Sequence, residues 1–365
     1  LNASEVAQGA SHGITVHPET NQIQTHLRDK SFNFDTVIPE DAKQSDVHEV
    51  VMPLVSQFVE GYNATILAYG QTGAGKTFTM GSGFKPTDDP TTVGIIPRVV
   101  EDIFEATKAR AVDTAFTISV SYLEIYNEHV NDLLLKGELP AKGYQLQKDS
   151  HGNYDVAGLT HAPVATLQHV AECLEYGAHR RSTAATNMNA HSSRSHAVFT
   201  IRLEQEPLAS AGAGAGGDED MTSPVAVKKT SLFRLVDLAG SERAKKTGAE
   251  GDRLREATNI NQSLTTLGQC IMALAAKSKH VPFRNSKLTQ LLMNSLGGNS
   301  ATLMVACVSP ADTSFEETLQ TLRYADSASS IENKPVINAD PMASHNVKLR
   351  GMLQDLRVEL SRLYA

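Results

Sequence analysis

The sequence predicts an α/β fold, a β-sheet packed against layers of helices, and three observations lead to this prediction. Short apolar runs rich in β-branched residues alternate along the chain with longer segments of helical periodicity. A glycine-rich loop directly follows one of the apolar runs. The chain has 365 residues, of which 41% are hydrophobic and 20% charged, so it has the length and the composition to bury a sizeable core.

The expected elements follow one another as strands with helices between them. We expect strands where apolar and β-branched residues are concentrated, at 64–69, 115–125, 197–205, 229–237 and 301–308. We expect helices where apolar residues have helical spacing, at 45–61, 97–108, 166–182, 256–277, 286–295 and 314–332. The last helix has a recognisable start, because Ser314 and Glu317 have the spacing of a capping box.

The glycine-rich loop at 70–77 reads GQTGAGKT and matches the phosphate-binding pattern GxxxxGK[ST] throughout. Its glycines let backbone N–H groups surround phosphate oxygens, and the following helix offers its N-terminus to the same charge. Lys76 is expected to contact the β- and γ-phosphates, and Thr77 to bind Mg²⁺. A chance match is about a one-in-a-hundred event, so an incidental glycine-rich turn is the weaker interpretation. The loop residues assigned to nucleotide binding are Gln71, Thr72, Gly73, Ala74, Gly75, Lys76 and Thr77.

Composition and cysteine spacing narrow the class of protein. No apolar stretch of roughly 18 residues predicts a membrane span, and the first residues lack the basic start and apolar core of a secretory signal. Cys173, Cys270 and Cys307 have no metal-ligand spacing and are expected to be reduced, buried thiols of a cytosolic or nuclear protein. The net charge of −8 argues against general nucleic-acid binding but leaves local basic patches open.

Three segments are not expected to belong to the packed core. Residues 209–220, an Ala/Gly run that ends in three acids, are expected to form a flexible loop between two strands. The pattern at 335–344 is that of an extended, proline-bounded segment, which is typical of a connector. Beyond them, two heptads of leucines predict either the start of a dimeric coiled coil or a helix that packs back on the domain. The leucines are Leu349, Leu353, Leu356, Leu360 and Leu363.

Two further segments carry nucleotide chemistry. Residues 189–196 read NAHSSRSH, and residues 237–242 read DLAGSE directly after a strand-like run. An Asp that ends a buried strand is the expected partner of Mg²⁺, so Asp237 is a candidate metal residue. Gly240 lies three residues later and can present its N–H to the γ-phosphate.

Together with the phosphate loop, these two segments resemble the switch I and switch II sequences of kinesin motor domains. The resemblance extends over about residues 30–340 and includes YLEIYNE at 122–128, ATNINQSL at 257–264, VPFRNSKLT at 281–289 and SLGG at 295–298. It implies the P-loop NTPase kinesin motor fold, with a central mixed, mostly parallel sheet and helices on both faces. It further implies a motor domain at 1–332, a neck linker and connector at 333–344, and a neck helix at 345–365.

Shorter stretches look most like the chromokinesin-type, or kinesin-4, group. They are GSGF at 81–84, EGDRL at 250–254 and RYAD at 323–326. The kinesin-5 group is the second choice, because NINQSL at 259–264 and HVP at 280–282 resemble it as well.

The resemblance implies roles for the residues around the γ-phosphate. Ser193 is implied to join Thr77 and Asp237 as a metal residue, while Asn189 and Ser192 order the attacking water. Arg194 and Glu242 are implied to pair across the switches when the γ-phosphate is present, which closes the pocket and relays the proton of the water. The plainer interpretation of that pair is a surface ion pair worth under about 1 kcal/mol. The implied catalytic set is Asn189, Ser192, Arg194, Gly240 and Glu242.

Three further residues have alternative interpretations. Phe78 is implied to stack on the adenine, and the alternative is a simple core aromatic. His191 and His196 do not predict a metal site, because no third ligand is apparent.

Kinesins usually begin with a strand carrying RxRP, which contacts the base and has a central place in the sheet. This chain starts just after the position of that motif. We expect the strand to be cropped or disordered rather than absent from the protein, because its loss would expose backbone polar groups. The alternative is that the adenine contacts are reduced.

Basic residues are concentrated at 243–287, a segment that contains nine Lys or Arg residues and three Asp or Glu residues. The segment therefore carries +6, and the rest of a chain whose total is −8 carries −14. This pattern predicts an acidic partner, with a solvated helix face as the alternative. The resemblance identifies the partner as the microtubule, whose binding then weakens as salt rises. The residues implied to contact it are Lys245, Lys246, Lys277, Lys279, Arg284 and Lys287.

The resemblance therefore implies an ATPase that uses ATP and Mg²⁺ and moves along microtubules toward the plus end. Movement at Gly240 is implied to tilt the helix at 256–277 and to free a groove for the neck linker at 333–338. We expect a cytoplasmic location on microtubules, with the spindle or nucleus as further candidates, and a homodimer through the C-terminal heptads.

Two other functions stay open. One is regulation of microtubule plus-end dynamics with little motility. The other is a nucleotide-dependent binding module with little hydrolysis, against which the intact Lys76, Arg194 and Glu242 argue.

Overall fold

The computed structural model describes residues 1–84, 89–148, 154–183, 193–208, 227–242 and 252–339, except positions 2, 8, 139, 141 and 142. Of residues 3, 4, 183 and 252–261 only the backbone is described, and beyond 339 only positions 352, 356 and 362. The expected loop at 209–220 lies outside the described residues, as do most of the predicted heptads.

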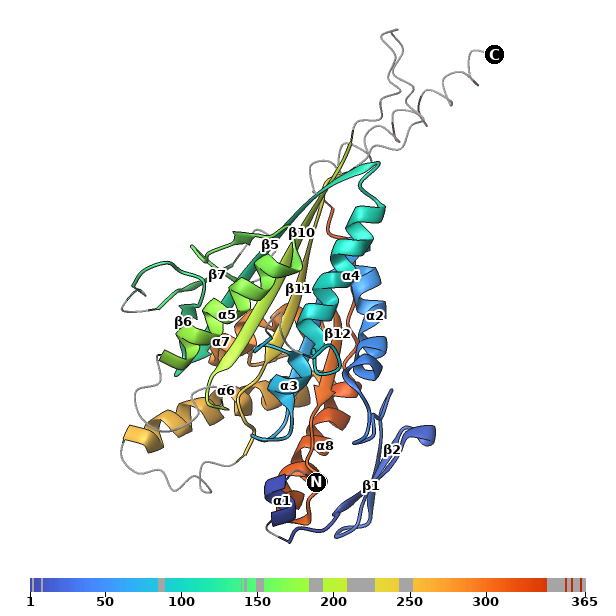
Figure 1. Cartoon of the computed structure of the whole chain (residues 1–365), viewed down its shortest axis with the longest axis vertical. Coiled ribbons are helices and arrows are strands. Elements are labelled where there is room, and N and C mark those ends of the chain that lie inside the picture. The colour runs from blue at the N-terminus through green and yellow to red at the C-terminus, as the bar shows by residue number, and fades with distance from the viewer. Residues whose placement is uncertain are drawn as a thin grey trace.

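A mixed β-sheet forms the centre of the molecule, and all five predicted strands belong to it (Figure 1). Its order is β12-β4-β11-β10-β5-β6, with β9 beside β5. The neighbours β12, β4 and β11 pair in parallel, and β5 runs in their direction, while β10, β6 and β9 run the other way. The strands are β4 (Ala64–Tyr69), β5 (Thr114–Tyr126), β6 (His129–Asp132), β9 (Ala162–Pro163), β10 (His196–Pro207), β11 (Lys229–Asp237) and β12 (Ala301–Ala306).

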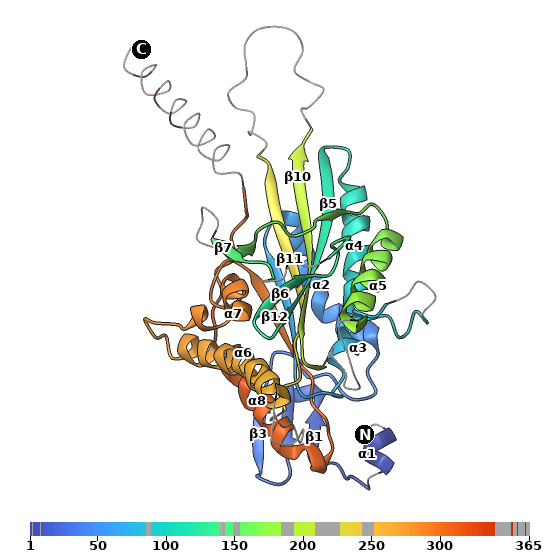
Figure 2. The same ribbon diagram turned by 90° about the vertical axis from the view of Figure 1, so that its left-hand side faces the viewer.

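Helices cover both faces of the sheet, as predicted, and Figure 2 shows the two layers on either side of the strands. One face packs against α2 (Gln44–Glu60), α3 (Lys76–Met80), α4 (Ile95–Ala109) and α5 (Leu167–Thr183). The other face packs against α6 (Asp252–Ala275), α7 (Lys287–Leu291) and α8 (Phe315–Ser329). None of the helices in the described part of the chain combines the length and the apolarity that a bilayer crossing needs.

The strand β4 explains why the phosphate loop sits at the centre of the molecule. All six of its residues are buried, and it lies between β12 and β11 with helices on both faces. A strand covered on both faces is a nearly continuous hydrophobic run, which is why the limits of β4 could be predicted from sequence. Its carboxyl end delivers the chain directly into residues 70–77.

Several short elements were not predicted. The strands β1 (Ile14–His17), β2 (Gln22–Thr25) and β3 (Lys30–Asn33) form a separate sheet that packs on α8. The strands β7 (Leu146–Lys148) and β8 (Tyr154–Val156) form a two-stranded sheet, and α1 (Ala3–Ala7) lies near the N-terminus. Strands of three or four residues with exposed polar positions carry little periodic signal.

Two local predictions were wrong. The helix expected at 286–295 is divided: α7 ends at Leu291, and a 3₁₀ turn follows at Met293–Ser295. Ser314 precedes α8 but does not cap it, since its side chain makes no capping hydrogen bond. Instead its hydroxyl accepts a hydrogen bond from Gln71 Nε2 at 3.1 Å. The hydroxyl therefore binds the phosphate loop and not a backbone N–H of α8.

The outer edge of β12 borders a cavity of about 410 Å³ lined by apolar residues, among them Val37, Leu303, Val305 and Leu322. Within the described ranges, no strand pairs with this edge. The expected RxRP strand is likewise not among the described residues.

Candidate functional site

The phosphate loop connects β4 to α3 and needs its glycines. Gly70, Gly73 and Gly75 have φ values of 149°, 84° and 99°, in the region that glycine adopts without strain. A Cβ atom at Gly70 would lie only 2.0 Å from the carbonyl oxygen of Cys307, which follows β12. The close approach of these two segments therefore depends on the absence of a side chain.

The Lys76 ammonium is held inside the loop. Its Nζ donates hydrogen bonds to the carbonyl oxygens of Gly70 at 2.8 Å and Gln71 at 2.9 Å, and the residue is 7% exposed. Burial lowers the pKa of this ammonium, while the carboxylate of Asp237 acts in the opposite direction. An anion that enters the loop thus meets a positive charge that is already desolvated.

Two members of the predicted metal set, Thr77 near the start of α3 and Asp237 at the end of β11, contact each other. The Thr77 hydroxyl donates to Asp237 Oδ2 at 2.8 Å. Asp237 Oδ1 is buried and has no hydrogen-bond partner among the described residues. A hydroxyl and a carboxylate are oxygen donors of the kind that Mg²⁺ prefers, and the open carboxylate oxygen gives this ion a ligand, so the residues fit it.

Arg181, near the C-terminal end of α5, is a member of the site that sequence analysis missed. Its buried guanidinium lies 3.7 Å from Asp237 Oδ2 and 3.6 Å from Glu124 Oε1. It also donates to the Ser195 hydroxyl at 2.9 Å and to the Ser195 carbonyl at 2.8 Å. Arg181 belongs to no nucleotide motif, and its role emerges only when the sheet brings the two carboxylates together.

His196 ties switch I (189–196), switch II (237–242) and α6 to one another. Its Nδ1 accepts the N–H of Ala239 at 3.0 Å, which assigns the ring proton to Nε2, 2.7 Å from the Ser263 hydroxyl on α6. Burial, with a further contribution from Arg181, lowers the pKa of His196 to about 3, so the ring is neutral. The sequence motif contained this histidine, but its spacing did not indicate either partner.

The switches and the phosphate loop are also joined directly. Gly240 N–H donates to the Ser193 carbonyl at 2.8 Å, and Ser241 N–H donates to the Gly70 carbonyl at 3.1 Å. Glu242 accepts hydrogen bonds from the Thr72 N–H at 2.8 Å and from the Thr72 hydroxyl at 2.5 Å. In this structure Glu242 is therefore bound to the phosphate loop, and its pairing with Arg194 stays a prediction.

The remaining nucleotide and catalytic residues divide into two groups. Phe78, on α3, is 59% exposed, so the alternative of a core aromatic is wrong and its stacking on adenine stays a prediction. Asn189 and Ser192 lie outside the described residues.

The predicted track-binding residues that are described come from one stretch of chain between the end of α6 and the start of α7, on the helix layer at the left of Figure 2. Lys277, Lys279 and Arg284 are exposed. Lys287 is half-buried, and its Nζ donates to the Tyr144 carbonyl at 3.3 Å. These four residues are called the basic face below. Lys245 and Lys246 lie outside the described residues.

Residues 333–339, called the neck segment below, lie along the domain after α8. Asn333 Oδ1 accepts the Gly297 N–H at 2.6 Å, and the Val336 N–H donates to Asn299 Oδ1 at 2.7 Å. The Asn338 N–H donates to the Gly61 carbonyl at 2.9 Å. The end of this segment thus touches the C-terminus of α2, far from it in sequence.

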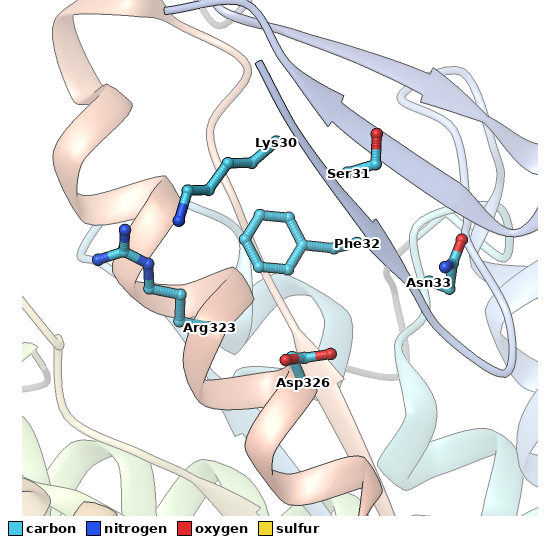
Figure 3. A pocket seen from close by; sticks show the side chains of 6 residues that line it. All are labelled: Lys30, Ser31, Phe32, Asn33, Arg323 and Asp326. Atoms are coloured by element: carbon cyan, nitrogen blue, oxygen red, sulfur yellow. The ribbon is translucent and has the colours of Figure 1, made fainter. Parts of the chain in front are cut away.

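A separate hollow of about 490 Å³ lies between β3 and α8 (Figure 3). Lys30 and Arg323 extend toward the same side of it, and the ring of Phe32 points from β3 toward the helix. Its lining residues, Lys30, Ser31, Phe32, Asn33, Arg323 and Asp326, include no member of the phosphate loop or the switches.

Comparison with known proteins finds one family over most of the chain. Residues 2–331 match the family described as Kinesin motor domain. Over 99% of this chain, chromosome-associated kinesin KIF4 is 44% identical in Mus musculus and 47% identical in Xenopus laevis. Kinesin-like protein KIN-4A of Gossypium hirsutum is 44% identical, also over 99% of this chain. These similarities support the kinesin-4 group over the kinesin-5 group.

The chain spans only part of these relatives, 28% of each KIF4 protein and 36% of KIN-4A. The solved structure of a fast kinesin resembles this one with a TM-score of 0.80 and 40% sequence identity. That match covers 93% of this chain and 91% of the other, so the fold predicted from sequence is confirmed.

Proposed function

Because this chain belongs to the kinesin motor domain family, we propose that it is the ATP-hydrolysing, microtubule-binding head of a plus-end-directed kinesin-4 motor. The observation that carries the proposal is a continuous set of hydrogen bonds from the phosphate loop through switch II to α6. Thr72 binds Glu242, Gly70 binds Ser241, and His196 joins Ala239 to Ser263. A change at the nucleotide therefore has a physical route to the helix beside the basic face.

The nucleotide is held by residues that now bind one another. Lys76 would exchange the carbonyls of the loop for phosphate oxygens of ATP, while Thr77, Asp237 and Ser193 would hold Mg²⁺. Bound Mg²⁺ neutralises charge that develops on the β- and γ-phosphates. Arg181 keeps a buried positive charge 3.7 Å from Asp237 Oδ2.

The switches respond to the γ-phosphate by changing partners. Gly240 gives its N–H to the γ-phosphate instead of to Ser193, and Glu242 leaves Thr72 to pair with Arg194. Asn189 and Ser192 then order the water that attacks. Each change replaces an existing hydrogen bond with another, so the two arrangements are close enough in free energy to be switched by a ligand.

Switch II transmits this change to the track. The Ala239 N–H donates to His196, which is also hydrogen-bonded to Ser263 on α6. A shift of switch II therefore displaces α6 through His196. The basic face begins just after α6 and is proposed to bind the acidic surface of the microtubule together with Lys245 and Lys246. The neck segment is proposed to dock and undock as α6 and α8 move, which directs the step toward the plus end.

The location and assembly of the whole protein are part of the same proposal. Relatives are named chromosome-associated kinesins, which favours the spindle or the nucleus in addition to cytoplasmic microtubules. The leucines of the predicted heptads, Leu349 to Leu363, are proposed to pair two heads.

A gliding assay with polarity-marked microtubules tests the function. Heads fixed to a surface are expected to move microtubules with their minus ends leading, in the presence of ATP and not of ADP. Gliding in the opposite polarity would contradict the assigned direction. Microtubules that change length without gliding would instead favour regulation of plus-end dynamics.

A further inference from the structure

The turn between β5 and β6 has an unusual backbone. It consists of Asn127 and Glu128, whose φ values are 52° and 59°. A two-residue hairpin turn with both residues in the left-handed region is most often built from Asn and Gly. Glutamate at the second position is disfavoured there, since its Cβ crowds the backbone. The YLEIYNE stretch at 122–128 ends at this turn.

The Glu128 side chain spans from this turn to the start of α7. Its Oε2 accepts the Lys287 N–H at 2.8 Å, and its Oε1 accepts the Ser286 hydroxyl at 3.1 Å. Ser286 is 1% exposed and is itself the N-cap of α7, because its hydroxyl accepts the Leu288 N–H. Glu128 therefore satisfies a backbone donor that the short helix leaves unpaired.

A second contact fixes the same point of the basic face. The Lys287 Nζ donates to the Tyr144 carbonyl, while the Tyr144 N–H donates to the Val130 carbonyl on β6. The backbone and the side chain of Lys287 are thus both tied to the β5–β6 hairpin. Arg284 precedes Ser286 by two residues, in the 3₁₀ turn that leads into α7.

We propose that Glu128 is a positioning residue for microtubule binding, which holds the start of α7 so that Arg284 and Lys287 face the partner. This inference rests on the function proposed above. A direct contact between Glu128 and an acidic partner is repulsive, so its carboxylate serves the interface through Ser286 and Lys287.

Simple electrostatics and positioning make opposite predictions for the removal of this charge. If Glu128 acts only as a negative charge near the basic face, its neutralisation strengthens binding to the acidic microtubule. If it positions α7, its loss weakens binding. We therefore compare Glu128→Ala and Glu128→Gln in the full chain. The matched control is Glu101→Gln, at an exposed position of α4 on the opposite face of the sheet.

The measurement is ATP hydrolysis as a function of microtubule concentration. We expect Glu128→Ala to raise the microtubule concentration at half-maximal rate about fivefold. Glu128→Gln should raise it less, because its amide oxygen can still accept the Lys287 N–H. The hydrolysis rate without microtubules and the rate at saturation should each stay within about twofold, and Glu101→Gln should match the unaltered chain.

Two results overturn the proposal. An unchanged or lower half-maximal concentration in Glu128→Ala means that the carboxylate positions nothing for binding. An equal loss of hydrolysis without microtubules means that Glu128 supports the fold as a whole. Failure of the proposed motor function can be told apart from failure of this inference. If microtubules do not stimulate ATP hydrolysis by the unaltered chain, the motor function itself is contradicted, whatever the Glu128 variants do.

Discussion

Glu242 of switch II and Thr72 of the phosphate loop are joined by two hydrogen bonds, from the Thr72 N–H at 2.8 Å and from the Thr72 hydroxyl at 2.5 Å. Both carboxylate oxygens are used in this way. A Cβ atom at Gly240 would lie 2.3 Å from the Thr72 hydroxyl, so the glycine allows this close packing. The predicted pairing of Glu242 with Arg194 would replace these bonds, so we infer that Thr72 restrains the proposed closure of the pocket.

Replacement of Thr72 by valine should release this restraint. Thr72→Val keeps the shape of the side chain but removes the hydroxyl that donates to Glu242. Hydrogen bonds to charged groups contribute about 1.5–3 kcal/mol, so we expect ATP hydrolysis without microtubules to rise about tenfold. Thr72→Ser keeps the donor and should retain the original rate. A Thr72→Val rate equal to that of the unaltered chain would show that the bond restrains nothing.

Phe78 should affect nucleotide affinity far more than stability. The side chain is 59% exposed, so Phe78→Ala is expected to change the free energy of unfolding by less than about 1 kcal/mol. If the ring stacks on adenine, the same change weakens ATP binding by about 1–3 kcal/mol. Equilibrium titration with a fluorescent ATP analogue and urea unfolding give the two values. Unaltered affinity would remove Phe78 from the nucleotide site.

His196 should make the stability of the fold depend on pH. Burial lowers the pKa of His196 to about 3 from its ordinary value of 6.5, so below pH 6.5 the unfolded chain binds a proton that the folded chain excludes. Stability from this group is complete above that pH and falls as the pH drops, by up to about 1.4 kcal/mol per pH unit.

The comparison with His196→Gln isolates this effect. Glutamine does not titrate, so the free energy of unfolding of the variant should fall less steeply than that of the unaltered chain between pH 7.5 and 5 at constant ionic strength. Urea unfolding at several pH values measures both slopes. Parallel curves for the two proteins would mean that His196 is protonated in the folded state as easily as in the unfolded one.

Asn299 should control docking of the neck segment. Its Oδ1 accepts the Val336 N–H, and its Nδ2 donates to Asn338 Oδ1 at 2.9 Å. Asn299→Ala removes both bonds and should shift the segment toward the undocked state by about thirtyfold, since each bond contributes about 1 kcal/mol. A spin label on the segment reports its mobility. The control is Asn33→Ala, in the small N-terminal sheet, and equal mobility in both variants would contradict the assignment.

The larger elements could be predicted because their burial leaves a clear pattern in the sequence. The strands β4 and β11 begin and end as predicted, since β4 is buried throughout and a functional motif directly follows each of them. The small sheet of β1, β2 and β3 was missed because each strand has only four residues and at least half of them are polar. Short strands of this kind are defined by packing on α8 rather than by their own periodicity.

The site shows the same division. Lys76, Thr77 and Asp237 could be assigned, because their chemistry and their spacing occur together in contiguous motifs. Arg181 could not, since it meets Asp237 only through the tertiary fold. Ser314 was assigned to the wrong partner because a hydroxyl that can cap a helix can equally bind Gln71, and sequence alone does not decide between the two.

The most direct test of the motor function is steady-state ATP hydrolysis with and without stabilised microtubules, at low and at moderate salt. We expect strong stimulation by microtubules, and a half-maximal microtubule concentration that rises with salt because the basic face is proposed to bind an acidic surface. A rate that microtubules leave unchanged, although nucleotide binds, would contradict the coupling between the phosphate loop and the track.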